Sequence, residues 1–507
     1  MAGPRLPTWA IPLVLLIGGL AVRMIDLTDE PLDRPSRQLR SAILTRGIYY
    51  RLLPDPDPIE AEAAIAMADS LEEFEPPIFE AVVAWSYILI GREVLWVARI
   101  YSSLAWLAAG VLLYEVARRF TSPRGGWVSL AFFLFVPSSS LIGRVFQPDP
   151  FMILGIAACL YAHVRWSETG EGRWALLSGA LGGVAILIKA FALLPVLGLW
   201  VGGRISAGRA GLRDRSAWIS LGLILTVPGV YYGLRLQQVS SGYVEFWTGS
   251  FLPMLSQLRF YTGWLSMIRH LMDGTALLAG LAGTLLLPRP GRKLAIGLWA
   301  GTVAYGLSVP WQTTTHDYYS LPFLPLVALG LAPLGDRVLG EVANSGRVWR
   351  WALALIAVCA IAYSALLTRN AWLATDYRSE PADWRRIGEA IPRDGATLAL
   401  THEYGYRLMY YGRRPVSSWP SASDLGLVVA RGGNSAPDFD STFVELTRGF
   451  RYFLVTLFGE LEAQPSLRER LCLGYELEAS GGAFLLFDLL HPRADGIDVC
   501  QADGVGQ

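Results

Sequence analysis

Long apolar stretches separated by short polar loops dominate the first 370 residues of the chain. A bilayer-crossing helix needs about 17–25 predominantly apolar residues. Such segments lie near residues 9–25, 94–117, 126–143, 150–166, 216–236, 267–288, 294–310, 319–335 and 350–368. The stretch 174–203 allows two interpretations, one tilted span or two short spans hinged around Lys189. We therefore expect a polytopic α-helical membrane protein.

The positive charges in the loops favour the second interpretation of residues 174–203. Basic residues gather in the loops near residues 118–124, 165–173, 204–215, 289–293 and 337–350. Cytoplasmic loops carry an excess of Lys and Arg, and two crossings would place all of these loops on one side. We expect about eleven spans in the cytoplasmic membrane, with the N-terminus in the cytoplasm and the C-terminus outside it.

The first outer loop, residues 26–92, has helical patterns of its own. In residues 36–53, apolar Leu39, Ile43 and Leu44 recur at helical spacing between arginines, which predicts an amphipathic helix in the membrane interface. A second, acidic segment spans residues 59–74, and the apolar run 81–90 is too short to cross alone. We group this loop with the spans in a membrane domain, residues 1–370.

The polar tail, residues 371–507, has a different pattern. A helix-like segment at 381–391 precedes strand-like runs at 397–401 and 452–457, and a hairpin is expected around residues 481–488. This alternation predicts a small extracytoplasmic α/β domain. Cys472 and Cys500 both lie in this tail and could pair if it faces an oxidising compartment.

Composition supports the assignment to the membrane. Of the 507 residues, 53% are hydrophobic and 17% are charged, and the mean hydropathy is +0.37, which excludes an ordinary soluble enzyme. The net charge is zero, so no basic surface for nucleic acid is expected. The four cysteines lack the spacing of a metal site, and Cys159 and Cys359 lie in apolar runs, where we expect inert burial.

Hydrogen-bonding and charged residues collect on the outer rim of the predicted spans. The first loop begins with several acidic residues, Asp26, Asp29, Glu30 and Asp33. Candidate substrate-binding residues are Arg37, Gln38, Glu75, Arg144, Asp149, Lys189, His316, Asp317, Tyr318 and Tyr319. Cations of this kind neutralise phosphate, and a carboxylate can activate an acceptor hydroxyl or amine as a general base. The rim therefore suits a lipid-linked phosphate substrate.

Three of these positions also have ordinary structural explanations. Asp149 is fixed between Pro148 and Pro150 and could simply cap the following helix, but we expect it at a turn on the outer face, as a site-positioning carboxylate and not as a buried charge. Lys189 could extend to the interface, or it could await a phosphate. The turn that begins at His316 could belong to an interfacial aromatic belt.

Four segments resemble motifs of the GT-C membrane glycosyltransferases, nearest to the protein O-mannosyltransferase and aminoarabinose transferase branch. The resemblance covers about the first 370 residues. Residues 37–46 resemble the first-loop helix of that family, and residues 74–78 resemble the entry of its second helix. Residues 147–150 resemble its proline-aspartate turn, and residues 316–322 resemble a later outer turn.

The resemblance implies a glycosyltransferase that moves a hexosyl or pentosyl group from a polyprenyl-phosphate sugar to a lipid, glycan or protein acceptor. A first-loop aspartate would be the catalytic base, and Asp33 is our choice. Lys189 would contact the donor phosphate, Asp149 would position donor or acceptor, and His316 and Tyr319 would line the donor pocket. No cofactor is certain, and the need for a divalent cation stays open.

Two other functions compete with this one. A transporter or flippase of lipid-linked sugars would need a polar path through the spans and often shows inverted repeats, whereas the polarity of this chain collects on one face. A non-catalytic assembly protein would bind a partner through its tail and would tolerate the loss of every first-loop carboxylate.

Overall fold

The computed structural model describes residues 7–71, 75–235, 249–425, 438–493, 495 and 497–502. The chain forms two compact units. One, called here the helical unit, comprises Met1–Thr28, Glu73–Ile78 and Trp96–Thr375. The other, called the mixed unit, comprises Asp29–Glu72, Phe79–Leu95 and Asp376–Gln507.

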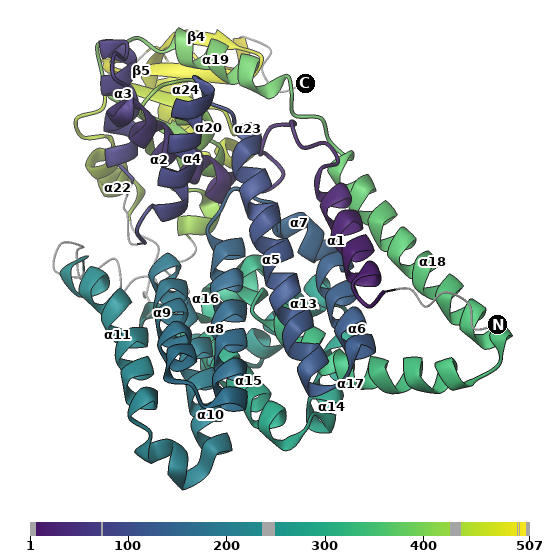
Figure 1. Cartoon of the computed structure of the whole chain (residues 1–507). Helices are drawn as coiled ribbons and strands as arrows, with labels where there is room; N and C mark the ends of the chain where they lie inside the picture. The colour runs from purple at the N-terminus through teal and green to yellow at the C-terminus, as the bar shows by residue number, and fades with distance from the viewer. Residues whose placement is uncertain are drawn as a thin grey trace. The chain divides into compact units, whose positions relative to one another are not determined.

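The helical unit is built from long helices joined by short turns (Figure 1). These elements are α1 (Ala10–Arg23), α5 (Trp96–Phe120), α6 (Pro123–Phe135), α7 (Pro137–Ile142), α8 (Asp149–Thr169), α9 (Gly172–Ile188), η1 (Ala190–Ala192), α10 (Leu193–Arg213), α11 (Arg215–Arg235), η2 (Gly249–Ser256), α13 (Leu258–Met272), α14 (Gly274–Leu286), α15 (Arg289–Ser308), α16 (Pro310–Thr315), η3 (Asp317–Ser320), α17 (Phe323–Asn344) and α18 (Arg347–Trp372).

The helical unit has the character of a membrane bundle. Five helices among the described residues are long and apolar enough to cross a membrane, and four shorter helices are apolar. The multi-pass helical membrane fold is confirmed. The total of about eleven spans and the orientation of the termini stay predictions.

The stretch 174–203 consists of two helices, as the loop charges predicted. α9 ends at Ile188, Lys189 adopts extended backbone, and α10 begins at Leu193 after one turn of 3₁₀ helix. The span predicted at 267–288 is also divided, and the prediction of one continuous span there is wrong. Asp273 separates α13 from α14, and its carboxylate accepts a hydrogen bond from the backbone N–H of Thr275.

Glycines bring α10 and α15 into close contact. A Cβ atom added to Gly198 would lie 2.3 Å from the carbonyl oxygen of Gly297. A Cβ atom added to Gly297 would likewise lie 2.3 Å from the carbonyl oxygen of Gly198. Small residues at such positions let the backbones of membrane helices approach each other. At the basic ends of these helices, Lys293 donates a hydrogen bond to the carbonyl oxygen of Ile205. The basic turns α10–α11 and α14–α15 lie at the same end of the helical unit (Figure 1).

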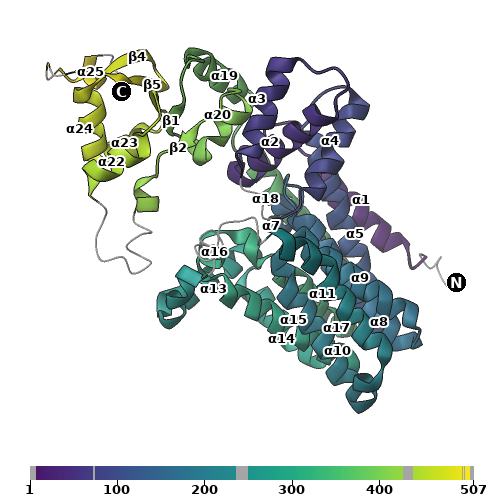
Figure 2. The same cartoon turned by 90° about the vertical axis from the view of Figure 1, so that its left-hand side faces the viewer.

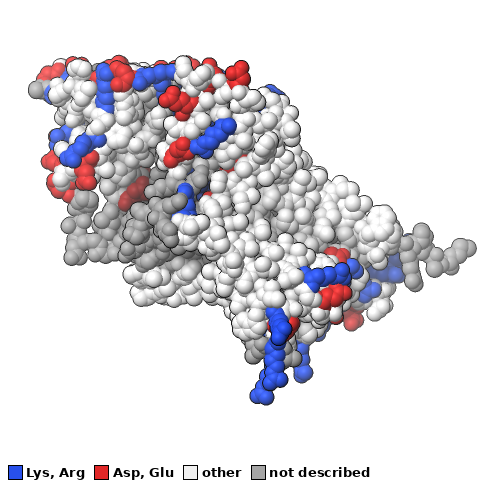
Figure 3. Space-filling view, turned by 60° about the vertical axis from the view of Figure 1, so that its left-hand side comes forward, with Lys and Arg blue, Asp and Glu red and all other residues white. Residues whose placement is uncertain are grey.

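Charged side chains on the surface of the helical unit are confined to one end of it on the face that Figure 3 shows. The rest of its surface on that face is largely free of Lys, Arg, Asp and Glu. Large apolar side chains are exposed instead, for example Val348, Leu355 and Tyr363 along α18. An exposed apolar surface of this extent fits contact with lipid.

The mixed unit contains first-loop helices together with the polar tail. The first-loop helices are α2 (Pro35–Leu52), α3 (Pro58–Asp69) and α4 (Ile78–Ile90), whose first residue belongs to the helical unit. Leu39, Ile43 and Leu44 of α2 are buried, and the location of this helix in the membrane interface stays a prediction. Residues 29–72 and 79–95 thus form one compact unit with residues 376–507. The predicted domain boundary at 370/371 stays a prediction.

The tail forms the α/β fold that the sequence predicted (Figure 2). Its strands are β1 (Thr397–Leu400), β2 (Ser417–Ser418), β3 (Tyr452–Val455), β4 (Tyr475–Gly481) and β5 (Phe484–Pro492). Their order is β2-β1-β3-β5-β4, in which β1 pairs in parallel with β2 and β3, and β5 pairs antiparallel with β3 and β4. The expected hairpin is β4–β5.

Helices accompany the sheet of the mixed unit. They are α19 (Glu380–Ala390), η4 (His402–Gly405), α20 (Tyr406–Tyr410), α22 (Phe439–Thr447), α23 (Phe458–Glu462), α24 (Pro465–Gly474) and α25 (Val499–Ala502). α19 matches the helix predicted at 381–391. Phe453, Phe487 and Leu471 belong to the buried core between the sheet and these helices.

Candidate active site

The two ionisable residues that the sequence singled out most strongly meet inside the helical unit. Asp149 is the first residue of α8, and Lys189 lies at the break between α9 and α10. The Nζ atom of Lys189 lies 2.6 Å from Oδ1 of Asp149, and neither residue is exposed to solvent. The expectation that Asp149 is not a buried charge is therefore wrong. The burial is tolerated because Lys189, 40 residues later in the chain, supplies the opposite charge.

Aromatic rings surround the cation of this pair. The Nζ atom of Lys189 lies 5.0 Å from the ring centroids of both Tyr318 and Tyr319. Tyr305 and Phe191 stand behind them, each with its ring against Tyr319. Ring faces attract cations, more strongly when water is excluded. The break after α9 and the short helix η3 thus build a buried cation site with aromatic walls.

Two buried polar atoms beside the pair lack a hydrogen-bond partner among the described residues. They are Oδ2 of Asp149 and Nε2 of Gln147, two residues earlier in the same turn. An unsatisfied buried polar group costs about 1–3 kcal/mol and is a feature that calls for an explanation. One acceptor and one donor next to a lysine with three N–H groups can take up the hydroxyl and phosphate oxygens of a ligand.

The predicted outer turn 316–319 lies against this cluster. The His316 ring lies 5.4 Å from the Tyr318 ring and 6.1 Å from the Tyr319 ring, and its Nδ1 atom is 2.8 Å from the hydroxyl of Thr315. His316 is exposed, Asp317 is half-buried, and Tyr319 is buried. The structure therefore brings Tyr318 and Tyr319 beside Lys189, with His316 against both tyrosine rings and Asp317 in the same turn. The roles of His316 and Tyr319 in lining a donor pocket stay predictions.

Glu75 and Arg144 have different surroundings within the helical unit. Glu75 interacts electrostatically with Tyr305, one of the aromatic residues behind Lys189. Arg144 is buried, donates hydrogen bonds to the carbonyl oxygens of Arg23 and Ile25, and has its guanidinium carbon 3.2 Å from the ring centroid of Trp372. These contacts give Arg144 a structural role at the end of α1, and its substrate-binding role stays a prediction.

In the mixed unit, the first-loop acidic residues differ in their surroundings. Asp29 is buried and accepts a hydrogen bond from the backbone N–H of Tyr377, and Glu30 accepts one from the hydroxyl of Tyr411. Asp33 is exposed, and its Oδ1 atom accepts a hydrogen bond of 3.1 Å from Nε2 of Gln38. An exposed and oriented carboxylate is what a general base requires. Asp26, the fourth acidic residue, is half-buried in the helical unit.

Gln38 and Arg37 both lie in the first turn of α2. Gln38 is fully buried, and its Nε2 atom also donates to the carbonyl oxygens of Pro31 and Arg34, so it shapes the turn that carries Asp33. Arg37 is half-buried. Their substrate-binding roles stay predictions.

Two buried charged residues of the first loop were not predicted from the sequence. Glu80 is 5% exposed within the apolar α4 and accepts a hydrogen bond from the hydroxyl of Ser41. Arg46 forms an ion pair with Glu93, and its guanidinium carbon lies 3.8 Å from the ring centroid of Tyr410. Burial lowers the pKa of Arg46, but Glu93 outweighs this effect and the pKa lies above its usual range. The sequence does carry a signal for Glu80, because it is the single acidic residue in the apolar run 78–90.

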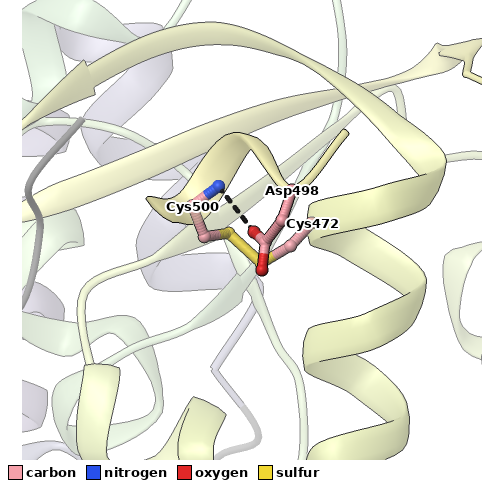
Figure 4. A group of neighbouring side chains, drawn as sticks. All are labelled: Cys472, Asp498 and Cys500. Atoms are coloured by element: carbon pink, nitrogen blue, oxygen red, sulfur yellow. Dashed lines mark hydrogen bonds between the residues drawn. A yellow bond between two sulfur atoms is a disulfide. The ribbon is translucent and has the colours of Figure 1, made fainter. Parts of the chain in front are cut away.

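One group of three residues in the described part of the chain has the spacing of metal ligands, namely Cys472, Asp498 and Cys500. Figure 4 shows that the two sulfur atoms are joined in a disulfide, while the Asp498 carboxylate accepts a hydrogen bond from the backbone N–H of Cys500. Because the two sulfur atoms are bonded to each other, neither is a thiolate that could bind a metal, and the disulfide links α25 to α24.

Comparison with known proteins identifies relatives. Residues 75–232, less than half of the chain, match the family described as dolichyl-phosphate-mannose-protein mannosyltransferase. The lipid A galacturonosyltransferase RgtD of Rhizobium johnstonii is 26% identical over 167 residues, which are 32% of this chain. The match spans 34% of that relative.

Solved structures share the fold over nearly the whole chain. ArnT from Cupriavidus metallidurans in the apo state is similar with a TM-score of 0.58 and 17% identity, over 94% of this chain and 97% of ArnT. The archaeal oligosaccharyltransferase AglB from Archaeoglobus fulgidus has a TM-score of 0.55 and 12% identity, over 94% of this chain and 74% of AglB. The resemblance to the GT-C membrane glycosyltransferases is confirmed.

Proposed function

We propose that this chain is a membrane glycosyltransferase that moves a sugar from a polyprenyl-phosphate donor to an acceptor outside the cytoplasm. The observation that carries the proposal is the buried Lys189–Asp149 pair with its tyrosine walls, inside a fold that the chain shares with ArnT and AglB. ArnT has been crystallised with undecaprenyl phosphate, and AglB has been solved with a dolichol phosphate. Both ligands are polyprenyl phosphates.

The donor phosphate would bind at Lys189. The lysine is fully buried, and its ammonium group is held by Asp149 and by two aromatic rings. A preorganised cation stabilises the charge that develops on a leaving phosphate, because the site needs no rearrangement as the bond breaks. The unsatisfied Oδ2 atom of Asp149 would accept a hydrogen bond from a sugar hydroxyl.

Asp33 would act as the general base. It takes the proton of the acceptor hydroxyl or amine, the acceptor oxygen or nitrogen bonds to the anomeric carbon, and the bond from that carbon to the lipid phosphate breaks. The configuration at the anomeric carbon is inverted in a single displacement. The exposure of Asp33 and its hydrogen bond from Gln38 support this role.

The acceptor and the type of sugar have less support. The name of the bacterial relative specifies a galacturonosyl group and lipid A, and the matched family specifies mannose and protein. The Cys472–Cys500 disulfide supports an extracytoplasmic mixed unit, since disulfides persist in oxidising compartments. Nothing in the fold or the relatives favours the transporter alternative.

Membranes that contain the protein provide the test. They would be incubated with radiolabelled polyprenyl-phosphate hexoses, hexuronic acids and pentoses, together with lipid, glycan and peptide acceptors. We expect label to leave one donor class and free polyprenyl phosphate to appear in equal amount. Movement of intact donor across the membrane without loss of sugar would support a transporter instead.

A further inference from the structure

The turn that carries Asp33 is tied to the C-terminal part of the mixed unit on its N-terminal side. The Tyr411 hydroxyl donates a hydrogen bond of 2.8 Å to Oε2 of Glu30, three residues before Asp33. Asp29 accepts from the backbone N–H of Tyr377 at 3.1 Å, and Arg378 lies 3.9 Å from the same carboxylate. Two adjacent carboxylates of the first loop are therefore bound to residues 377–411.

The same turn is tied on its C-terminal side by α2. The fully buried amide of Gln38 bonds the carbonyl oxygens of Pro31 and Arg34 as well as the Asp33 carboxylate. Leu32, between the two sets of contacts, is 3% exposed. The carboxylate of Asp33 thus projects from a short segment whose two ends are fixed by different parts of the mixed unit.

α2 is itself fastened to α20. One nitrogen of Arg46 donates to the carbonyl oxygen of Tyr410 at 2.5 Å, and the Tyr410 hydroxyl donates to Glu93, the ion-pair partner of Arg46. Tyr410 and Tyr411 are adjacent in sequence, and together they contact both sides of the turn that carries Asp33. Tyr410 fixes the helix after Asp33, and Tyr411 fixes the carboxylate before it.

We propose that Tyr411, acting through Glu30, is a positioning residue for the first-loop carboxylate Asp33. The C-terminal part of the mixed unit, residues 376–507, would then take part in the catalytic step. The proposal rests on the proposed function for its effect on transfer. A misplacement of about 1 Å caused by a distant substitution can cost about a hundredfold in rate. Loss of one anchoring hydroxyl should therefore lower the rate of the chemical step without changing how the donor binds.

The substitution Tyr411→Phe tests this role, because it removes the hydroxyl and keeps the ring. We expect kcat to fall about tenfold to a hundredfold, and the KM for the polyprenyl-phosphate sugar to stay within twofold. Tyr452→Phe is the matched control, since its hydroxyl donates to Asp394 at 2.9 Å in the same unit. The control should keep kcat within twofold.

The partner residue gives a second, independent variant. Glu30→Gln retains an acceptor oxygen for Tyr411 and should keep more activity than Glu30→Ala. The double variant Tyr411→Phe/Glu30→Ala should be no slower than the slower single variant, because both remove the same contact. Multiplicative losses in the double variant would overturn the proposal, and so would a Tyr411→Phe protein with normal kcat or with a raised donor KM alone.

Backbone hydrogen exchange provides a readout that does not depend on transfer. Residues 29–38 should exchange at least fivefold faster in purified Tyr411→Phe than in the wild type, and Tyr452→Phe should leave them unchanged. Unchanged exchange in Tyr411→Phe would overturn the positional role even if the enzyme is active. Absence of transfer by the wild type with every donor would count against the proposed function, while the exchange result would still decide the anchoring.

Discussion

Lys189 and Asp149 form an ion pair of 2.6 Å between side chains that are 0% and 1% exposed. Removing one partner of a buried ion pair typically costs about 3–5 kcal/mol, because the other charge is left without compensation. Lys189→Met and Asp149→Asn should each lower the thermal midpoint in detergent. The double variant should be less destabilised than the sum of the two.

The other lysine of the chain, Lys293, offers a control for the loss of a lysine. It donates one hydrogen bond to a backbone carbonyl oxygen at an exposed position. Lys293→Met should therefore change the thermal midpoint far less than Lys189→Met. If the two variants melt at the same temperature, the buried pair does not form.

The second prediction concerns Asp33. General-base catalysis contributes typically a hundredfold to ten-thousandfold to the rate, so Asp33→Asn should reduce transfer by a factor in that range. Membrane insertion and the thermal midpoint should be nearly unchanged, because Asp33 is exposed. Initial rates with labelled donor would measure the loss. A variant with full activity would show that another carboxylate is the base.

The third prediction concerns the disulfide between Cys472 and Cys500, which are separated by 28 residues. A cross-link of this loop length stabilises a protein by about 3.6 kcal/mol in the chain-entropy model. Replacement of both cysteines by serine should make the C-terminal domain more sensitive to protease.

The same disulfide reports the location of the domain. A mass-tagged maleimide should modify Cys472 and Cys500 in denatured protein from cells only after reduction. Modification without reductant would argue against an oxidising, extracytoplasmic location. Cys359 is exposed in α18, so the expectation that it is buried is wrong, whereas Cys159 is buried as expected. Cys359 should be modified in both cases and provides the internal standard.

The fourth prediction is a pH effect from Asp488. Burial raises the pKa of this carboxyl group, but a hydrogen bond from the backbone N–H of Leu490 and the nearby His491 and Arg451 outweigh it, so the pKa lies below its usual value. A lowered folded-state pKa stabilises the fold above the unfolded value of about 3.9. That stabilisation is lost as the pH falls through the folded-state pKa.

Asp488→Asn should therefore lower the thermal midpoint at pH 7, and the difference from the wild type should shrink below about pH 4. Thermal scans of the full chain in detergent between pH 7 and pH 3 would measure it. A difference that grows as the pH falls would contradict the assignment.

Local pattern in the sequence was enough to predict many elements. The break at Lys189 followed from loop charge, and the strands β1 and β3 followed from short β-rich runs in the tail. These features depend on residues within one segment or on the side of the membrane that a loop occupies. The location of Asp273 between two helices was not predicted, although Arg269 and the Asp273-Gly274 pair interrupt the apolar character of residues 267–288 and Asp-Gly is a typical turn signal.

Contacts between distant segments could not be predicted from the local sequence pattern. Asp149 and Lys189 were both selected, yet their pairing depends on how α8 packs against α9 and α10. The same limit applies to Tyr411 and Glu30, which lie 381 residues apart. Periodicity shows which side of a helix is apolar, but it does not show which other segment covers that side.

Transfer by the purified protein tests the central claim most directly. Wild type and Lys189→Met would be incubated with a polyprenyl-phosphate sugar labelled in the sugar, and both free polyprenyl phosphate and labelled acceptor would be counted. We predict that the wild type forms the two products in equal amounts and that Lys189→Met forms at most a hundredth as much, about 3 kcal/mol in transition-state stabilisation. Sugar that stays on its lipid with the wild type, or equal transfer by both proteins, would contradict the account.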